Sequence, residues 1–386
     1  MDRDQKRIIE AQLGGQSMRF ATHPGFPYWD EISPAMHLFA DNARISQGER
    51  VLVCPCGHGA LGVWAARRTE TVTLLDVNII ATEMARRTLD LNDIRSATIK
   101  AALPSSLATQ FDAVLLPLPK GRRFARLLLL QAFDALRSEG RLYLAGPNRG
   151  GIKSVIGDAE KLFGSAGILA YKGGNRIALL QKDGQRDPLP PIYREPGIAP
   201  HTYRTFQIEI NDESLTVYTR PGVFSWKNLD AGTRLLLETA QIRKTDHILD
   251  IGCGYGIIGI YAANQATEGS ATMVDVNVLA CDCARKSVAA NDVEQARVLL
   301  GDVLPPTPQE TFSLILSNPP FHTGHDVARS TARAFIHKAF EVLAPRGRLV
   351  MVANRFLPYD DTIKEVFGSA RILHQTSRYH VMQARK

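Results

Sequence analysis

The sequence carries one ordered set of short motifs twice. Val51–Gly59 (VLVCPCGHG) is echoed by Ile248–Gly256 (ILDIGCGYG) at an offset of 197 residues, as 254 minus 57 shows. Three further matches keep the same order: Leu75–Asn78 with Val274–Asn277, Leu91–Ile94 with Ala290–Val293, and Phe163–Ala166 with Phe367–Ala370. Because these matches span most of each half, they predict the duplication of a whole domain.

A proline-rich stretch marks the predicted boundary between the two copies. Between Asp183 and Pro200 the chain has prolines at positions 188, 190, 191, 196 and 200. Proline fixes φ and removes a backbone donor, so this density disfavours both helices and strand ladders. We therefore expect a first domain over residues 1–185, a linker over 186–204 and a second domain over 205–386.

Each copy has the pattern of an α/β domain. In the second copy, short apolar runs alternate with helical stretches at 247–251, 256–264, 271–274 and 281–291. This alternation predicts a mostly parallel sheet with helices on both faces. Ahead of it, residues 206–210 and 215–219 alternate apolar and polar side chains around Asn211-Asp212, which predicts a β-hairpin.

The bulk properties restrict the compartment and the partners. The 386-residue chain has no apolar run near the roughly 20 residues that a membrane span requires. Its first residues, MDRDQKR, lack the apolar region of a secretory signal, so we expect a cytoplasmic protein. The formal net charge of +7 favours a polyanion such as RNA or DNA, although many proteins without such a partner share it.

The five cysteines indicate buried thiols in a reducing compartment. An odd number in a long chain does not suggest a disulfide framework. Cys54 and Cys56 are one residue apart, as are Cys281 and Cys283, whereas zinc sites usually leave two to four residues between ligands. We therefore expect no metal site.

A glycine-rich loop between an apolar strand and an apolar helix predicts a ligand site. In Asp250-x-Gly252-x-Gly254-x-Gly256, the glycines let the backbone turn sharply and approach a ligand closely. Asp275 ends the next predicted strand, where a carboxylate can accept both hydroxyl hydrogens of a ribose. We expect a nucleoside-containing ligand. A dinucleotide is disfavoured because the spacing departs from the Gly-x-Gly-x-x-Gly fingerprint.

The strand-like run 314–317 ends in Asn318-Pro319-Pro320-Phe321, at the sheet edge where the ligand crevice opens. An exocyclic amine on a base is a poor nucleophile, so a site must orient it. The side-chain oxygen of Asn318 and the carbonyl of Pro319 can each accept one N–H, and Phe321 can stack on the base. Beside a nucleoside site, this pattern predicts methyl transfer from S-adenosylmethionine to an amine, a reaction that needs alignment more than a strong base.

Five motifs of the second copy carry a family resemblance. They are Arg220–Ser225 (RPGVFS), Leu229–Thr233 (LDAGT), Asp250–Gly256, Asn318–His322 (NPPFH) and Val352–Tyr359 (VANRFLPY). With them the chain resembles, over nearly its whole length, the ribosomal RNA guanine-N2 methyltransferases of the RsmC and RlmG type. The Thr323-Gly324 that follows His322 is closer to the branch that modifies a guanosine of 16S rRNA in the small (30S) ribosomal subunit than to the 23S branch.

The resemblance implies two tandem Rossmann-like class I methyltransferase domains, each a mostly parallel seven-stranded sheet with helices on both faces. It further implies an S-adenosylmethionine site in the second domain, made by Phe224, Asp230, Asp250, Gly252, Gly254, Gly256, Asp275 and Asp302, beside a guanine pocket at Asn318–Phe321. The residues alone leave Asp302 open between a contact to the adenine amine and an ordinary surface acid. Trp226-Lys227 departs from the Arg-Asp expected in this family.

The first copy has lost the residues of both sites. Val53 stands in place of Asp250 and Pro55 in place of Gly252, and Leu116–Lys120 (LPLPK) stands in place of Ser317–Phe321. We therefore expect a degenerate first domain without catalysis. The segment after the lost pocket combines an aromatic residue with the cations Lys120, Arg122, Arg123 and Arg126. These cations predict an RNA-facing surface or a solvated helix face.

Other functions share parts of this pattern. A 23S rRNA guanine-N2 methyltransferase, an adenine-N6 methyltransferase and a protein glutamine methyltransferase would keep the chemistry and change the acceptor. A non-enzymatic RNA-binding ribosome assembly factor would keep only a vestigial site, and the complete motif set of the second copy argues against it.

Overall fold

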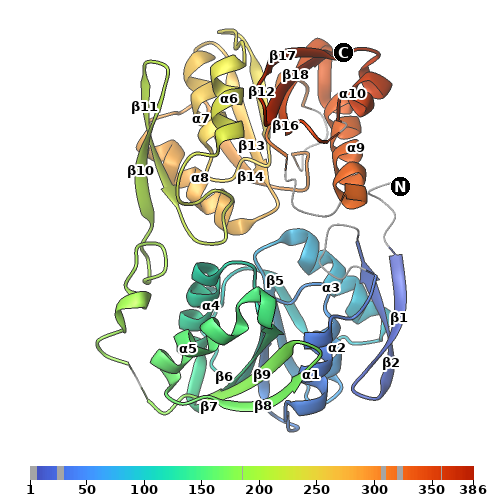
Figure 1. Cartoon of the computed structure of the whole chain (residues 1–386), viewed down its shortest axis with the longest axis vertical. Coiled ribbons are helices and arrows are strands. Elements are labelled where there is room, and N and C mark those ends of the chain that lie inside the picture. The colour runs from blue at the N-terminus through green and yellow to red at the C-terminus, as the bar shows by residue number, and fades with distance from the viewer. Residues whose placement is uncertain (1–6, 24–29, 185, 306–309, 320–324, 358) are drawn as a thin grey trace. The chain divides into compact units, whose positions relative to one another are not determined.

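The computed structural model contains two seven-stranded sheets, one in each copy of the repeated sequence (Figure 1). It describes residues 7–23, 30–184, 186–305, 310–319, 325–357 and 359–386. The chain divides into two compact units, a first unit that ends at Thr202 and a second unit from Tyr203 to Lys386.

The first unit begins with a hairpin of β1 (Arg7–Leu13) and β2 (Gln16–Thr22). Its sheet has the order β5-β4-β3-β6-β7-β9-β8. These strands are β3 (Arg50–Val53), β4 (Thr71–Asp76), β5 (Thr98–Ala101), β6 (Phe111–Pro117), β7 (Leu136–Pro147), β8 (Gly167–Lys172) and β9 (Asn175–Gln181). The helices are α1 (Pro34–Asn42), α2 (Ala60–Ala66), α3 (Ile79–Leu91), α4 (Arg122–Ala135) and α5 (Ile152–Phe163).

The second unit repeats this plan. A hairpin of β10 (Arg204–Ile210) and β11 (Glu213–Thr219) precedes a sheet of order β14-β13-β12-β15-β16-β18-β17. These strands are β12 (His247–Ile251), β13 (Ser270–Asp275), β14 (Ala296–Leu300), β15 (Phe312–Ser317), β16 (Leu343–Asn354), β17 (Arg371–Gln375) and β18 (Tyr379–Arg385). The helices are α6 (Ala231–Thr239), α7 (Ile257–Gln265), α8 (Val278–Ala290), α9 (His325–Val342) and α10 (Tyr359–Phe367).

Both sheets confirm the predicted fold class. The strands from β14 to β16 pair in parallel, and β18 inserts antiparallel between β16 and β17. In the second unit α6, α7 and α8 lie on one side of the sheet, and α9 and α10 lie on the other (Figure 1). This arrangement is a Rossmann-like fold in which the carboxyl ends of β12, β13, β14 and β15 meet at one edge.

Local sequence explains where several elements begin. The side chain of Asn277 accepts a hydrogen bond from the N–H of Leu279 and caps α8, and Asn78 caps α3 through Ile80 in the same way (2.9 Å each). This pairing of identical caps is the physical basis of the Asp-Val-Asn match between the two copies. The predicted hairpin is confirmed, with its two-residue turn at Asn211-Asp212. The β1–β2 hairpin, by contrast, was not predicted from the sequence.

Much of the proline-rich segment is folded against the first unit. The ring of Tyr193 is fully buried, and its hydroxyl donates to the carbonyl oxygen of Asp158 in α5 (2.7 Å). The carboxylate of Glu195 accepts hydrogen bonds from Arg123 (2.9 Å) and Arg126 (3.2 Å) of α4. The two compact units consequently meet between Thr202 and Tyr203 in the sequence, later than the start of the expected linker.

No helix within the described ranges is long and apolar enough to cross a membrane.

Candidate active site

The glycine-rich loop of the second unit lies between β12 and α7. Gly252, Gly254 and Gly256 have φ angles of +74°, +57° and +90°, values that residues with a Cβ rarely adopt. A Cβ at Gly252 or Gly254 would meet no atom of the described residues within 4 Å, whereas at Gly256 it would lie 3.1 Å from the Cβ of Ala284 in α8. The first two glycines therefore leave open space at the strand end, and the third allows α7 to pack against α8.

Two carboxylates bind backbone N–H groups in this loop and directly after it. Asp275 accepts hydrogen bonds from the backbone N–H groups of Gly254 and Asn277 (2.9 Å each), and Asp250 accepts one from Gly259 (2.9 Å). Burial raises the pKa of Asp275 to about 6, although the backbone N–H groups oppose the rise. Burial, with a smaller contribution from the charge of Asp275, raises the pKa of Asp250 to about 8. Asp250 is fully buried, whereas Asp275 at the end of β13 is half-buried.

Asn318 lies beside the glycine loop. The strands β12 and β15 are parallel neighbours, and the hydroxyl of Ser317 at the end of β15 donates to the carbonyl oxygen of Ile251 at the end of β12 (2.7 Å). Gly252 and Asn318 are the next residues after these two. The structure therefore brings the loop and the predicted amine pocket to adjoining strand ends.

The amide of Asn318 is hydrogen-bonded on one side only. Its Nδ2 donates to Oδ2 of Asp230 (2.9 Å) and to Oγ1 of Thr233 (2.8 Å). Its Oδ1 is buried and has no hydrogen-bond partner in the described part of the chain, and the same holds for Oδ1 of Asp250. A buried acceptor without a partner is unfavourable unless a ligand or water supplies a donor. Oδ1 of Asn318 therefore marks a place where a donor of a bound molecule fits.

The remaining predicted site residues of the second unit have varied surroundings. Phe224 is 47% exposed, in a loop whose Gly222 carbonyl accepts a hydrogen bond from Nδ2 of Asn277 (2.9 Å). Asp302 follows β14 and lies 4.0 Å from the ammonium group of Lys338 in α9. The loop of Phe224 is thus hydrogen-bonded to Asn277, two residues after Asp275. The negative charge of Asp302 lies close to the positive charge of Lys338.

The pocket motif is described only in part. Pro319 is buried directly after Asn318. Phe321, the predicted stacking platform, lies outside the described residues, as does Pro320. The side chain of Asp230 accepts hydrogen bonds from Thr233 of α6 and from Asn318. Burial, and after it the charge of Asp230, raises the pKa of the Tyr255 hydroxyl in the glycine loop. Sequence reasoning missed this role for the Leu229–Thr233 motif.

The first unit keeps the shape of the loop but not its acid. Asp76 accepts hydrogen bonds from the N–H groups of Gly57 (3.1 Å) and Asn78 (3.0 Å), as Asp275 does in the second unit. Burial raises the pKa of Asp76. Val53 lies buried where the second unit has Asp250, and Pro55 stands in place of the first glycine. The first unit therefore retains the scaffold of the loop without the carboxylate in its central strand.

The cations predicted to face RNA are Lys120, Arg122, Arg123 and Arg126. Lys120 is exposed. Arg122 and Arg126 both bind the carboxylate of Asp158, whose side chain is 1% exposed (2.7 and 2.9 Å). Arg126 itself is 11% exposed and also contacts Glu195. Arg126 thus pairs with two carboxylates inside the first unit, because a buried carboxylate requires paired cations. An RNA-facing surface at this cluster stays a prediction.

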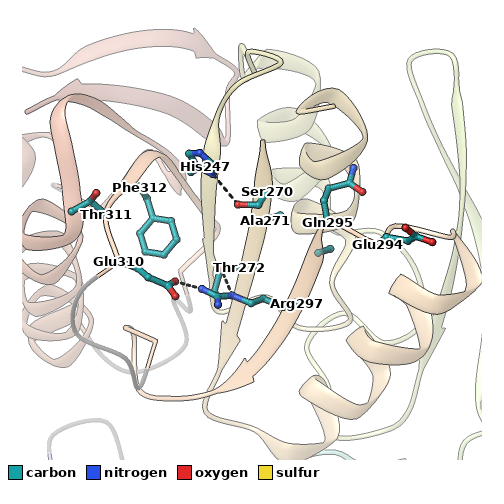
Figure 2. A pocket seen from close by; sticks show the side chains of 11 residues that line it. His247, Ser270, Ala271, Thr272, Glu294, Gln295, Arg297, Glu310, Thr311 and Phe312 are labelled. Carbon is teal, nitrogen blue, oxygen red and sulfur yellow. Dashed lines mark hydrogen bonds and ion pairs between the residues drawn. The ribbon is translucent and has the colours of Figure 1, made fainter. Parts of the chain in front are cut away.

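A hollow of about 500 Å³ lies at the opposite edge of the second sheet, at the amino ends of β12, β13, β14 and β15 (Figure 2). Two of its charged groups bind each other: Arg297 pairs with Glu310 and also donates to Oγ1 of Thr272 (2.9 Å). His247 Nδ1 and Ser270 Oγ are 3.0 Å apart. This hollow is remote from the strand ends that carry Gly252 and does not belong to the candidate site.

The described residues contain no group of three or more His, Cys, Asp or Glu side chains that could hold a metal ion. The five cysteines are buried and unpaired, and burial raises the pKa of each thiol.

Comparison with known proteins gives the family. The model of the "Methyltransferase small domain" family matches residues 17–178 and again residues 214–383. The chain is 32% identical over 360 residues to "Ribosomal RNA small subunit methyltransferase C" of Aeromonas hydrophila, which covers 91% of this chain and 97% of that protein. The protein of the same name from Vibrio parahaemolyticus is 31% identical over 279 residues, covering 72% of this chain and 78% of its own length. The chain belongs to the ribosomal RNA small subunit methyltransferase C family.

A solved member of this family has a similar structure. It is described as the T. thermophilus 16S rRNA N2 G1207 methyltransferase (RsmC) in complex with AdoMet and guanosine. The TM-score is 0.82 at 30% sequence identity, and all of both chains is covered. Membership of the family confirms the resemblance seen in the sequence and makes this chain a methyltransferase.

Proposed function

We propose that this methyltransferase transfers a methyl group from S-adenosylmethionine to the exocyclic N2 amine of a guanosine in the 16S rRNA of the small ribosomal subunit. The observation that carries the proposal is the buried Oδ1 of Asn318, which has no hydrogen-bond partner among the residues that the structure describes. Asn318 follows a strand end that adjoins the glycine loop. An amine N–H satisfies this acceptor. The choice of guanosine N2 in 16S rRNA is supported by the names of the family members.

The residues of the loop fit S-adenosylmethionine. Within the described part of the chain, Gly252 and Gly254 leave open space, and Oδ1 of Asp250 has no hydrogen-bond partner. Asp275 ends β13, where its carboxylate can accept the hydroxyl hydrogens of a ribose while its backbone N–H contacts keep it in place. Asp302, after the next strand, is assigned to the adenine. S-adenosylmethionine supplies a methyl group on a positively charged sulfur.

The chain's own contribution to the reaction is alignment. In the proposed complex Oδ1 of Asn318 accepts one amine N–H and the carbonyl of Pro319 accepts the other, which turns the nitrogen lone pair out of the base plane. Pro319 is buried and adds no competing donor. Phe321 is assigned the stacking of the base. Such fixed acceptors lower the barrier mainly through orientation, since the methyl group is already activated.

The two domains have different roles in this proposal. The second domain, residues 205–386, carries the cofactor and the amine pocket, and the first domain, residues 1–185, has a structural or RNA-binding role. The exposed Lys120 is the first candidate for a phosphate contact of the first domain. An rRNA substrate, within the small (30S) subunit, places the reaction in the cytoplasm.

The test is transfer of a labelled methyl group to defined RNA. The enzyme is incubated with tritiated S-adenosylmethionine and either naked 16S rRNA, 30S subunits or 23S rRNA, and the products are digested to nucleosides. We expect N2-methylguanosine from the small-subunit substrates. Label in N6-methyladenosine, in 23S rRNA or in a protein glutamine would assign another acceptor, and rRNA binding without any transfer would make the protein an assembly factor.

Asn318→Ala is the matched variant for this test. Loss of one preset acceptor is expected to lower kcat by roughly a hundredfold, on the scale of removing one oxyanion-hole donor. Affinity for S-adenosylhomocysteine, measured by calorimetry, should stay at the wild-type value because Asn318 is assigned to the amine and not to the cofactor. Equal loss of both would contradict the assigned role.

A further inference from the structure

The N-terminus of α6 is joined to the Asn318 amide by one carboxylate oxygen. Oδ2 of Asp230 accepts the N–H of Thr233 (3.0 Å) and so caps the helix. The same Oδ2 accepts a hydrogen bond from Nδ2 of Asn318 (2.9 Å). Oγ1 of Thr233 accepts the second hydrogen bond that this Nδ2 donates (2.8 Å). The cap of α6 and the amine pocket, 88 residues apart in sequence, therefore share one hydrogen-bonded group.

These contacts fix which way the Asn318 amide faces. A carboxylate accepts hydrogen bonds and has none to donate, so the NH₂ end of the amide must face Asp230. Oδ1 then faces away from α6, where it is buried without a partner in the described residues. A rotated amide would place two oxygens against each other and would present donors, not an acceptor, to an incoming amine.

The duplication provides an internal comparison. Ser33 stands at the N-cap of α1 as Asp230 does at that of α6, and its Oγ accepts the N–H of Met36 (3.4 Å). Met36 corresponds to Thr233 at the offset of 197 residues that also relates Val53 to Asp250.

Sheet register identifies the counterpart of Asn318 in the first unit. Val53 pairs with Leu115, as Asp250 pairs with Leu316. Asn318 lies two residues beyond Leu316, so its counterpart is Pro117.

All three members of the hydrogen-bonded group are therefore replaced in the degenerate copy, while the helix cap survives. Serine is as good an N-cap as aspartate, so capping alone does not require the carboxylate of Asp230. The longer side chain and second contact of Asp230 occur in the copy that has an asparagine to orient.

We infer that Asp230, with Thr233, is a positioning residue that holds the side-chain oxygen of Asn318 toward the target amine. The inference rests on the proposed function and deepens it. Asp230 acts through Asn318, so its loss should affect the amine substrate and turnover and leave the cofactor site unchanged.

The test compares two substitutions that both keep the helix cap. Asp230→Ser retains the capping oxygen, as Ser33 does, but is too short to reach Asn318. Asp230→Asn retains an acceptor oxygen that can serve both Thr233 and Asn318. We expect Asp230→Ser to lower kcat roughly ten- to hundredfold, the range for losing one charge-assisted hydrogen bond, and Asp230→Asn to restore most of it.

Further readouts separate positioning from folding. Asp230→Ser should weaken the binding of guanosine to the enzyme loaded with S-adenosylhomocysteine, while its affinity for S-adenosylhomocysteine and its melting temperature match those of Asp230→Asn. Thr233→Val, which keeps the backbone N–H of the cap, should give a smaller loss of kcat. The control Ser33→Ala removes the cap of α1 and should lower the melting temperature without changing kcat.

Wild-type kcat and guanosine affinity in Asp230→Ser would overturn the inference, as would an equal loss of kcat in Asp230→Ser and Asp230→Asn. Failure of the proposed function has a different signature, because the wild type would then methylate an acceptor other than guanosine N2. The two variants compared on that acceptor would still decide whether Asp230 orients Asn318.

Discussion

The buried carboxyl of Asp250 makes folding stability depend on pH in a way that one substitution can isolate. Its pKa is about 8 in the folded protein against an ordinary value of 3.8. The folded state thus keeps a proton that the unfolded chain releases. Stability is fully present below pH about 3.8 and is lost as the pH rises toward 8, by about 1.4 kcal/mol per unit. Between pH 5 and pH 8 the loss is on the order of 4 kcal/mol.

Asp250→Asn removes this titration and can still accept the N–H of Gly259. We expect its free energy of unfolding, relative to wild type, to rise by on the order of 4 kcal/mol between pH 5 and pH 8. Urea unfolding followed by circular dichroism measures this quantity, and hydrogen exchange in the Ile257–Gln265 helix assigns the transition to the second unit. Asp361→Asn, at an exposed position, controls for the change in formal charge. Parallel pH profiles of wild type and Asp250→Asn would refute the reasoning.

Calorimetry with S-adenosylhomocysteine should give one site per chain, because the first unit has Val53 in place of the buried acid; two sites of equal affinity would contradict a degenerate first copy. Burial lowers the pKa of His58 from 6.5 to about 4, so stability falls as the pH drops from about 6.5 to 4, by up to about 3 kcal/mol. His58→Leu should remove this acid slope in urea titrations, and an unchanged slope would argue against a buried neutral imidazole. Arg126→Ala should destabilise the first unit by about 3 kcal/mol because Asp158 loses a buried partner. Arg123→Ala, at a half-exposed pair, should cost about 1 kcal/mol or less in the same denaturation assay, and equal losses would be inconsistent with that structure.

Local sequence patterns were sufficient to predict the features that depend only on residues close together in the chain. The strand before Gly252 and the helix after Gly256 follow from local periodicity, and the three glycines do have the positive φ angles that such a turn requires. The repeat predicted two domains of one fold because a duplicated pattern of strands and helices implies a duplicated sheet. The β1–β2 hairpin carries the same local signal, because Ile9, Ala11 and Leu13 alternate with polar residues before the Gly14-Gly15 turn. It could therefore have been predicted from the sequence.

Contacts between distant segments were beyond local reasoning. The cluster from Lys120 to Arg126 has the composition of an RNA-binding surface, but Asp158 lies in another helix and reaches Arg126 only when α4 packs against α5. The Asp230 carboxylate likewise meets Asn318 only because α6 begins near the end of β15.

The amino-acid order by itself determined the duplication, the α/β fold and the glycine loop, since these depend on periodicity, turn chemistry and side-chain type over a few residues. Tertiary structure alone decided which acceptors remain without a donor. Strand order and helix docking bring Asp230 and Thr233 to the NH₂ end of Asn318 and bury Asp250 in the central strand. The direction of one amide and the protonation of one carboxyl are set by neighbours far away in the chain, and no local pattern records them.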